Sequence, residues 1–115
     1  MGVPAAGAIV LVPFPFSDLT QTKLRPALVL ANVGRGDSVL CQITSQAYGD
    51  RQAISVSNAE LLSGSLRVAS FARPGKLFTA NQKLTVRQIG TLRPEAFTTI
   101  VDSVVAVLRS GLPTP

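Results

Sequence analysis

The stretch FPFSDLTQTKLRPALVL, residues 14–30, decides how we expect the chain to be organised. An apolar start is followed by a polar loop at residues 17–23 and then by a second apolar run. This order predicts two strands joined by a long hairpin loop. Pro26 favours an extended backbone at Arg25, so the guanidinium of Arg25 would lie at the mouth of the second strand, where it can reach an anion. An ordinary surface charge is the alternative interpretation.

Length and composition limit the possible classes of protein. The 115 residues predict a single domain spanning residues 1–115, and 46% of them are hydrophobic, which is enough to build a core. Lys and Arg outnumber Asp and Glu by 11 to 6. This excess of positive charge favours a polyanionic partner, although many basic proteins bind no nucleic acid.

Two absences exclude several kinds of site. The chain has no His, which excludes a Ser-His-Asp arrangement and His ligation of a metal. The single Cys41 cannot form an internal disulfide and is interpreted as a buried small hydrophobic residue. With six scattered acids, we expect no metal site and no cofactor.

The amino-terminal region carries no sign of a membrane segment. The apolar run at residues 8–16 is too short to cross a bilayer and is interrupted by prolines. The start also lacks the basic segment of a signal peptide. We therefore expect a cytoplasmic protein without a membrane partner.

Short apolar runs bounded by Gly and Pro predict a series of strands. They fall at residues 9–12, which the following prolines end, and at residues 27–31, 38–44, 52–57, 66–72 and 76–79. The run at residues 27–31 is apolar enough for burial on both faces. Glycines predict turns at residues 32–37 and 45–50, and Asn58 is a candidate cap of a short helical turn.

The carboxyl-terminal part predicts one helix. Residues 84–89 fit either a strand or a short helical link that Gly90 ends. Pro94 suits a first helical position, and an apolar stripe continues to Leu108 before Gly111 stops it. The predicted fold class is α+β, mainly β: a small, strongly bent sheet or barrel covered by a C-terminal helix.

Five short pieces, in order, resemble the MazF/PemK toxins. They are GAIV at residues 7–10, KLRPALVL at 23–30, QITS at 42–45, RPGKLFT at 73–79 and IGTL at 89–92. The resemblance extends over about residues 7–108 and implies an SH3-like barrel of the CcdB/MazF type, usually a homodimer. It also implies a type II toxin that cleaves single-stranded RNA, often mRNA, without a metal. A cognate antitoxin protein would block it, and DNA would be contacted only through the antitoxin complex.

The resemblance carries the family's catalytic Arg and Thr over to Arg25 and Thr44, and a further catalytic Arg of some members to Arg73. Metal-free cleavage requires removal of the 2′-hydroxyl proton, stabilisation of the phosphorane and protonation of the 5′-oxygen. Arg25 can clamp a phosphate and Thr44 can donate its hydroxyl. An Arg with a pKa above about 12 is a poor base at neutral pH, so the general base stays unassigned. Without the resemblance, Thr44 is better read as a strand-end residue and Arg73 as a loop charge.

Seven further residues are assigned to RNA binding: Ser17, Asp18, Gln21, Lys23, Ser45, Lys76 and Arg87. Ser17, Asp18 and Gln21 lie on the loop that borders the RNA groove in relatives. Ser45 either caps a turn or binds a phosphate. Lys23, Lys76 and Arg87 are either phosphate contacts or solvated surface charges.

Two departures from the family pattern keep other functions open. Ala8 and Gly75 stand where relatives often carry acids, which weakens any mechanism that uses a carboxylate base. One alternative is a gyrase poison like the related CcdB proteins, although the chain has no Trp in its C-terminal segment. The other is a catalytically inactive barrel that binds nucleic acid or protein.

Overall fold

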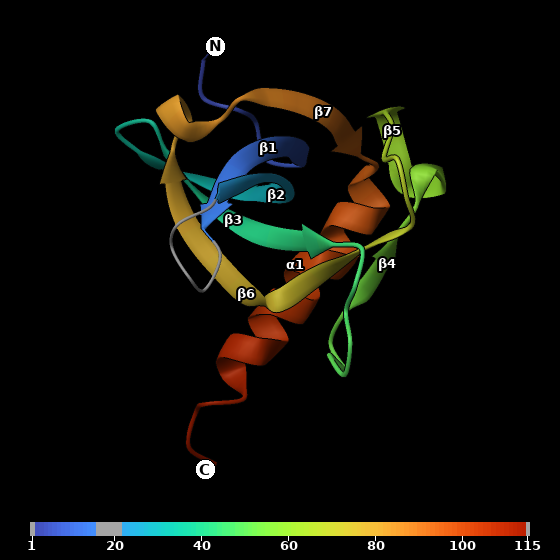
Figure 1. The fold of residues 1–115 in the computed structure, drawn as a ribbon. Coiled ribbons are helices and arrows are strands. Elements are labelled where there is room, and N and C mark those ends of the chain that lie inside the picture. Colours follow the sequence, from blue (N-terminus) through green and yellow to red (C-terminus); the bar gives the residue numbers. More distant parts are fainter. Residues whose placement is uncertain (1, 16–21, 115) are drawn as a thin grey trace.

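The described part of the chain folds into a curled sheet with one α-helix. The computed structural model describes residues 2–15 and 22–114. Within these residues, seven strands form one antiparallel sheet in the order β4-β6-β3-β2-β1-β7-β5. The elements are β1 (Ala8–Pro15), β2 (Thr22–Gly34), β3 (Asp37–Thr44), β4 (Ile54–Val56), η1 (Asn58–Glu60), β5 (Leu61–Gly64), β6 (Ser70–Asn81), η2 (Gln82–Leu84), β7 (Arg87–Leu92) and α1 (Pro94–Arg109). Figure 1 shows the strands curling into a half-barrel with α1 along one side, which confirms the predicted fold class.

Both faces of the central strands are buried. Leu28 of β2 belongs to a core that includes Ile100 of α1, whereas its neighbours Ala27 and Val29 belong to a second core on the opposite face. Successive side chains of a strand point to opposite faces, so each core takes every second residue. The predicted burial of both faces at the start of the second apolar run is thereby confirmed.

Proline does not end the first strand, contrary to the prediction. β1 continues through Pro13 and Pro15 because β7 pairs with β1 only as far as Leu11, which leaves one edge of the strand unpaired. A residue without an N–H group is tolerated on such an edge. Pro26 lies within β2 for a similar reason, since the pairing of β2 with β3 begins at Ala27.

The second strand is longer than predicted. β2 begins at Thr22, so Lys23 and Arg25 are strand residues, and Lys23 does not belong to a loop as predicted. The hairpin that follows matches the prediction and turns at Arg35 and Gly36, both with positive φ.

The chain between residues 52 and 92 departs most from the sequence prediction. β4 is only three residues long, and the strand predicted at residues 66–72 is wrong at its start, because β5 ends before it and β6 begins at Ser70. β6 then runs through Pro74 and Gly75 and includes the piece predicted at residues 76–79. Gly90 lies inside β7 instead of ending it.

The short helical turn near Asn58 is present but has a different cap. Ser57 is the N-cap of η1, and its Oγ accepts a hydrogen bond from the Ala59 N–H at 3.3 Å. Asn58 instead holds the loop after β5, because its Oδ1 accepts from the Leu66 N–H at 2.7 Å.

A large bulge interrupts the pairing of β6 with β3. Cys41 pairs with Leu77 and Ile43 pairs with Ala72, so only Gln42 of β3 lies opposite residues 73–76 of β6. Extra residues on one strand increase its bend and redirect its side chains. The bulge therefore turns the Arg-Pro-Gly-Lys piece away from a regular ladder.

The C-terminal helix matches its prediction. Pro94 is its first residue, Ile100 and Val104 are buried, and Leu108 near its end is exposed. No helix among the described residues is both long and apolar enough to cross a membrane.

Candidate functional site

A groove of about 940 Å³ lies where the ends of β2 and β3 approach β7 and the segment between β5 and β6. We call it the cationic groove, after its four basic side chains. Its polar side chains include Lys23, Arg25, Thr44, Ser45, Arg67 and Arg87. Among the residues that the structure describes, no Asp or Glu lines it. The groove is therefore suited to a polyanion.

The register of the sheet explains why Arg25 and Thr44 meet in this groove. Ala27 of β2 pairs with Gln42 of β3 in an antiparallel ladder. Continuing that register by two residues on each strand places Arg25 opposite Thr44, and residues directly opposite one another share a face. Both side chains are half-buried and line the groove.

The Thr44 hydroxyl is held by the turn that follows β3. Its Oγ1 donates to the carbonyl oxygen of Gln46 and accepts from the Gln46 N–H, each at 3.1 Å. Such turns fix the rotamer of a strand-end Thr. The hydroxyl can donate to a ligand only after it releases the Gln46 carbonyl.

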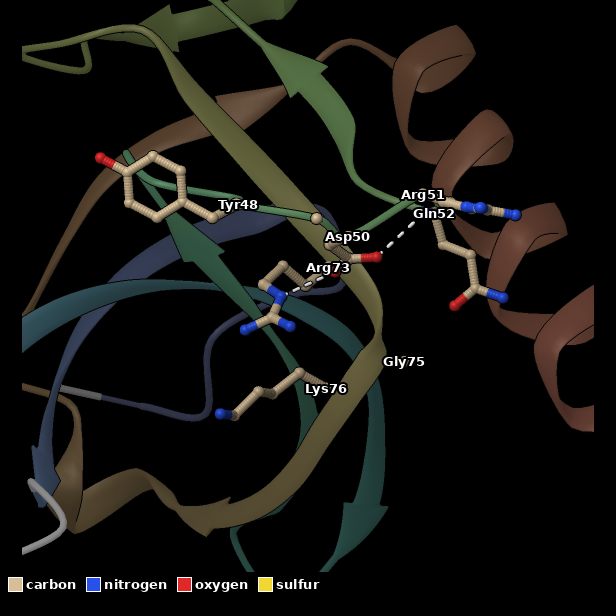
Figure 2. A pocket seen from close by; sticks show the side chains of 8 residues that line it. Tyr48, Asp50, Arg51, Gln52, Arg73, Gly75 and Lys76 are labelled. Atoms are coloured by element: carbon tan, nitrogen blue, oxygen red, sulfur yellow. Dashed lines mark hydrogen bonds and ion pairs between the residues drawn. The ribbon is translucent and has the colours of Figure 1, made fainter.

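A second hollow of about 470 Å³ lies beside the turn after β3. We call it the Tyr48 hollow; it is lined by residues 48–52, Arg73, Gly75 and Lys76. The Nε of Arg73 donates to the Asp50 Oδ2 at 2.7 Å (Figure 2). Its Nη1 donates to the Gln42 Oε1 at 3.4 Å. Arg73 is thus fixed by a carboxylate and a buried amide.

The ion pair determines the protonation of Asp50. The hydrogen bond from Arg73, followed by that from the Gln52 N–H at 2.9 Å, holds the pKa of Asp50 below its usual range. Asp50 therefore remains ionised at neutral pH and offsets part of the charge of Arg73.

Cys41 lies beneath the same hollow. Its side chain is fully buried, as the sequence predicted, and its Sγ donates to the Arg73 carbonyl oxygen at 3.1 Å. Burial raises the pKa of Cys41 to about 11, so the thiolate is scarce at neutral pH. The thiol thus supports the backbone that carries Arg73.

The predicted site residues fall into three groups. The cationic groove contains Lys23, Arg25, Thr44, Ser45 and Arg87, whereas Arg73 and Lys76 line the Tyr48 hollow. Ser17, Asp18 and Gln21 lie outside the described residues. No described group of three or more His, Cys, Asp or Glu side chains is placed to hold a metal ion.

Several polar residues of these hollows are not among the predicted site residues, and Arg67, Tyr48 and Asp50 are the most informative of them. The strand predicted at residues 66–72 includes Arg67, which instead lines the cationic groove from the segment between β5 and β6. Tyr48 and Asp50 belong to the turn predicted at residues 45–50 and line the Tyr48 hollow. The available signal was that Tyr48 is the single tyrosine of the chain and lies in a polar turn close to Thr44.

The curled sheet, the C-terminal helix and the cationic groove define a small half-barrel with a site for a polyanion, and comparison with known proteins identifies its family. The chain belongs to the family of PemK-like, MazF-like toxins of type II toxin–antitoxin systems, whose sequence pattern matches residues 5–108. No curated protein matches the sequence significantly.

Solved structures with the same fold share little sequence with this chain. A MazE-MazF structure from Deinococcus radiodurans is 19% identical to this chain, with a TM-score of 0.73. The match covers 92% of this chain and 96% of the chain in that structure. An endoribonuclease from Mycobacterial species is 18% identical, with a TM-score of 0.71, and the match covers 100% of this chain and 98% of the endoribonuclease chain. An endoribonuclease in complex with its cognate antitoxin, also from Mycobacterial species, is 18% identical, with 100% of each chain covered and a TM-score of 0.65.

Proposed function

We propose that this toxin-family protein is a sequence-specific endoribonuclease that cleaves single-stranded RNA, with mRNA as its target, without a metal ion. The observation that carries the proposal is that Arg25 and Thr44 line the same groove, whose described ionisable side chains are all cationic. Family membership and the fold shared with an endoribonuclease from Mycobacterial species support the same conclusion.

The proposed reaction is an internal transfer of the phosphodiester. The 2′-oxygen attacks phosphorus, the bond to the 5′-oxygen breaks, and the products carry a 2′,3′-cyclic phosphate and a 5′-hydroxyl. Arg25 stabilises the charge that develops on the non-bridging oxygens and hydrogen-bonds the leaving oxygen. Thr44 donates its hydroxyl to a non-bridging oxygen after releasing the Gln46 carbonyl. The group that accepts the 2′-proton stays unassigned.

Ala8 and Gly75, which stand where relatives often carry acids, lie in different places relative to the cationic groove. Ala8 is fully buried in the second core, so a side chain at this position faces the protein interior and not the groove. Gly75 is exposed and lines the Tyr48 hollow, where Asp50 is the described carboxylate. Because Asp50 is paired with Arg73, it is a weak base for the groove chemistry.

The same groove is the proposed docking site of an antitoxin protein. Leu24 and Val68 line it and are 47% and 58% exposed, next to its four cations. An acidic segment with apolar anchors complements such a surface, and it would compete with RNA. Two of the similar structures are complexes with an antitoxin or with MazE. We further propose that the protein is a homodimer and that it acts in the cytoplasm.

Substitution in the groove tests this function. We expect Arg25→Ala and Thr44→Ala to lower the rate of RNA cleavage by about 100-fold or more, the loss typical of one stabilising donor. Arg109→Ala is the matched control, because Arg109 is exposed at the end of α1 and lies outside the groove. Full activity of both groove variants would reject the assignment. A folded wild type that leaves diverse RNAs intact would favour the gyrase-poison or inactive-barrel readings.

A further inference from the structure

The Tyr48 hollow combines an exposed aromatic ring with cationic side chains. Tyr48 is 85% exposed, the highest value among the exposed large hydrophobic and aromatic residues of the described chain. Arg73 and Lys76 lie on the same side of the hollow as Tyr48, whereas Arg51 extends to the opposite side, toward α1 (Figure 2). One side of the hollow therefore presents a ring and two cations together.

An exposed ring that lines the same hollow as two cations, one of them fixed, matches the chemistry of a nucleotide. Aromatic faces stack on bases of single-stranded nucleic acids, and Arg and Lys contact the phosphates. Arg73 is preorganised for such a contact, because Asp50 and Gln42 hold its guanidinium in place. Lys76 adds a second cation, so the two cations outnumber the one carboxylate on this side.

The path of the backbone connects this hollow to the cationic groove. Thr44 and Ser45 line the groove, and the same turn reaches the Tyr48 hollow only three residues later. A strand of RNA with its scissile phosphate at Arg25 and Thr44 can therefore continue along this turn. Gln42 strengthens the connection, because it precedes Thr44 on β3 and accepts from Arg73.

We infer that the Tyr48 hollow is a subsite for a nucleotide flanking the cut, an inference that rests on the proposed ribonuclease function. Tyr48 stacks on the base, while Lys76 and Arg73 contact the adjacent phosphate. Asp50 is a positioning residue that fixes Arg73. Because stacking uses the face of any base, the subsite adds affinity and sets how far the bound RNA extends from the cut, without selecting one base.

The composition of the chain supplies a direct probe of this subsite. The protein has one Tyr and no Trp, so its intrinsic fluorescence comes from Tyr48 alone. The test titrates the full-length protein with an RNA that it cleaves, carrying one 2′-deoxynucleotide at the cut. We expect saturable quenching of Tyr48 emission, after correction for absorbance, at the concentrations that give binding by fluorescence anisotropy of a dye-labelled RNA.

Variants separate stacking from general attraction. Tyr48→Ala should bind the RNA about tenfold more weakly, a typical loss for one stacked base, and Tyr48→Phe should restore the affinity to within about twofold. Replacing one flanking nucleotide by an abasic residue should weaken binding to the wild type and leave Tyr48→Ala unaffected. Lys76→Ala should reduce the slope of log RNA affinity against log salt by the amount expected for about one phosphate contact. Arg51→Ala should reduce this slope less.

The outcomes distinguish this inference from the ribonuclease proposal. The subsite alone would be overturned if the protein cleaves RNA, RNA binding leaves Tyr48 emission unchanged, and Tyr48→Ala binds RNA as tightly as the wild type does. Absence of both cleavage and binding would overturn both. Quenching by an acidic antitoxin-like peptide but not by RNA would assign the hollow to a protein partner and reject the nucleotide subsite.

Discussion

At the scale of single residues, the pairing of Arg73 with Asp50 changes how Arg73 is understood. The resemblance implies a catalytic Arg at this position, yet the structure places Arg73 outside the cationic groove and against a carboxylate that is 13% exposed. A paired guanidinium remains a good hydrogen-bond donor, but part of its charge is offset. Fixing a neighbouring phosphate is therefore a better role for Arg73 than proton transfer.

The pKa of Asp50 leads to a pH-dependent stability. Because the pKa is lower in the folded state, Asp50 contributes stability above its unfolded pKa of about 4 and loses it as the pH falls through the folded value. We expect Asp50→Asn to lower the free energy of unfolding by roughly 0.5–1 kcal/mol at pH 7, as for a partly exposed ion pair. The difference from wild type should shrink below about pH 4.

Urea unfolding of wild type and Asp50→Asn at neutral pH and at about pH 3 measures this difference. An equal difference at both values, or a more stable variant at neutral pH, would show that the ion pair does not contribute as described. Asp102→Asn is a suitable control, since Asp102 is exposed on α1.

At the scale of secondary structure elements, the close antiparallel pairing of β5 with β7 depends on glycine. Gly64 has a φ of +82° and pairs with Gly90, and a Cβ added at Gly64 would overlap the carbonyl oxygen of Ile89. Gly64 also lines the cationic groove. The close contact of these two strands therefore forms one wall of the site.

Substitution of this glycine should be costly. We expect Gly64→Ala to destabilise the protein by more than about 2 kcal/mol, because it adds both an unfavourable φ and a clash with backbone atoms. Gly111→Ala, at a position with room for a Cβ, should change stability by less than about 0.5 kcal/mol. Thermal melts of the two variants beside wild type provide the comparison, and an unchanged stability of Gly64→Ala would contradict the close approach of β5 to β7.

The elements also show where sequence reasoning succeeds. The terminal helix was predictable because Pro94 and a long apolar stripe agree over 16 residues. Prolines misled the prediction in β1, because their tolerance depends on whether a neighbouring strand pairs with that edge. Pro74 and Gly75 are a local signal of the bend in β6, but the continuation of one strand through them depends on its pairing with β3 on both sides of the bulge.

At the scale of the whole molecule, the positive charge gathers by folding and not by sequence clustering. Lys23, Arg25, Arg67 and Arg87 come from three parts of the chain and meet in one groove. The resemblance implied Arg25 and Thr44 as members of one site, whereas Lys23, Ser45 and Arg87 were candidates because their side chains can bind phosphate, and all five line this groove. Arg67 could not be assigned to it, since only the three-dimensional path of the segment before β6 brings it there.

Convergent charge predicts a marked dependence of RNA binding on salt. Each phosphate that a cation contacts contributes a slope of about −0.7 to a plot of log affinity against log salt for single strands. We expect the four cations of the groove to contribute about −3 to this slope, and Arg67→Ala should reduce the magnitude of the slope by about 0.7. Arg109→Ala should leave it unchanged. Binding that does not respond to salt would exclude phosphate recognition by this groove.

The most direct test of the central claim is cleavage of single-stranded RNA by the wild-type protein in EDTA, with a matched RNA that carries one 2′-deoxynucleotide at the cut. The account predicts cleavage of the first RNA, fragments ending in a 2′,3′-cyclic phosphate and a 5′-hydroxyl, and no cleavage at the 2′-deoxy position. Cleavage at that position, or loss of all activity in EDTA, would contradict metal-independent attack by the 2′-hydroxyl.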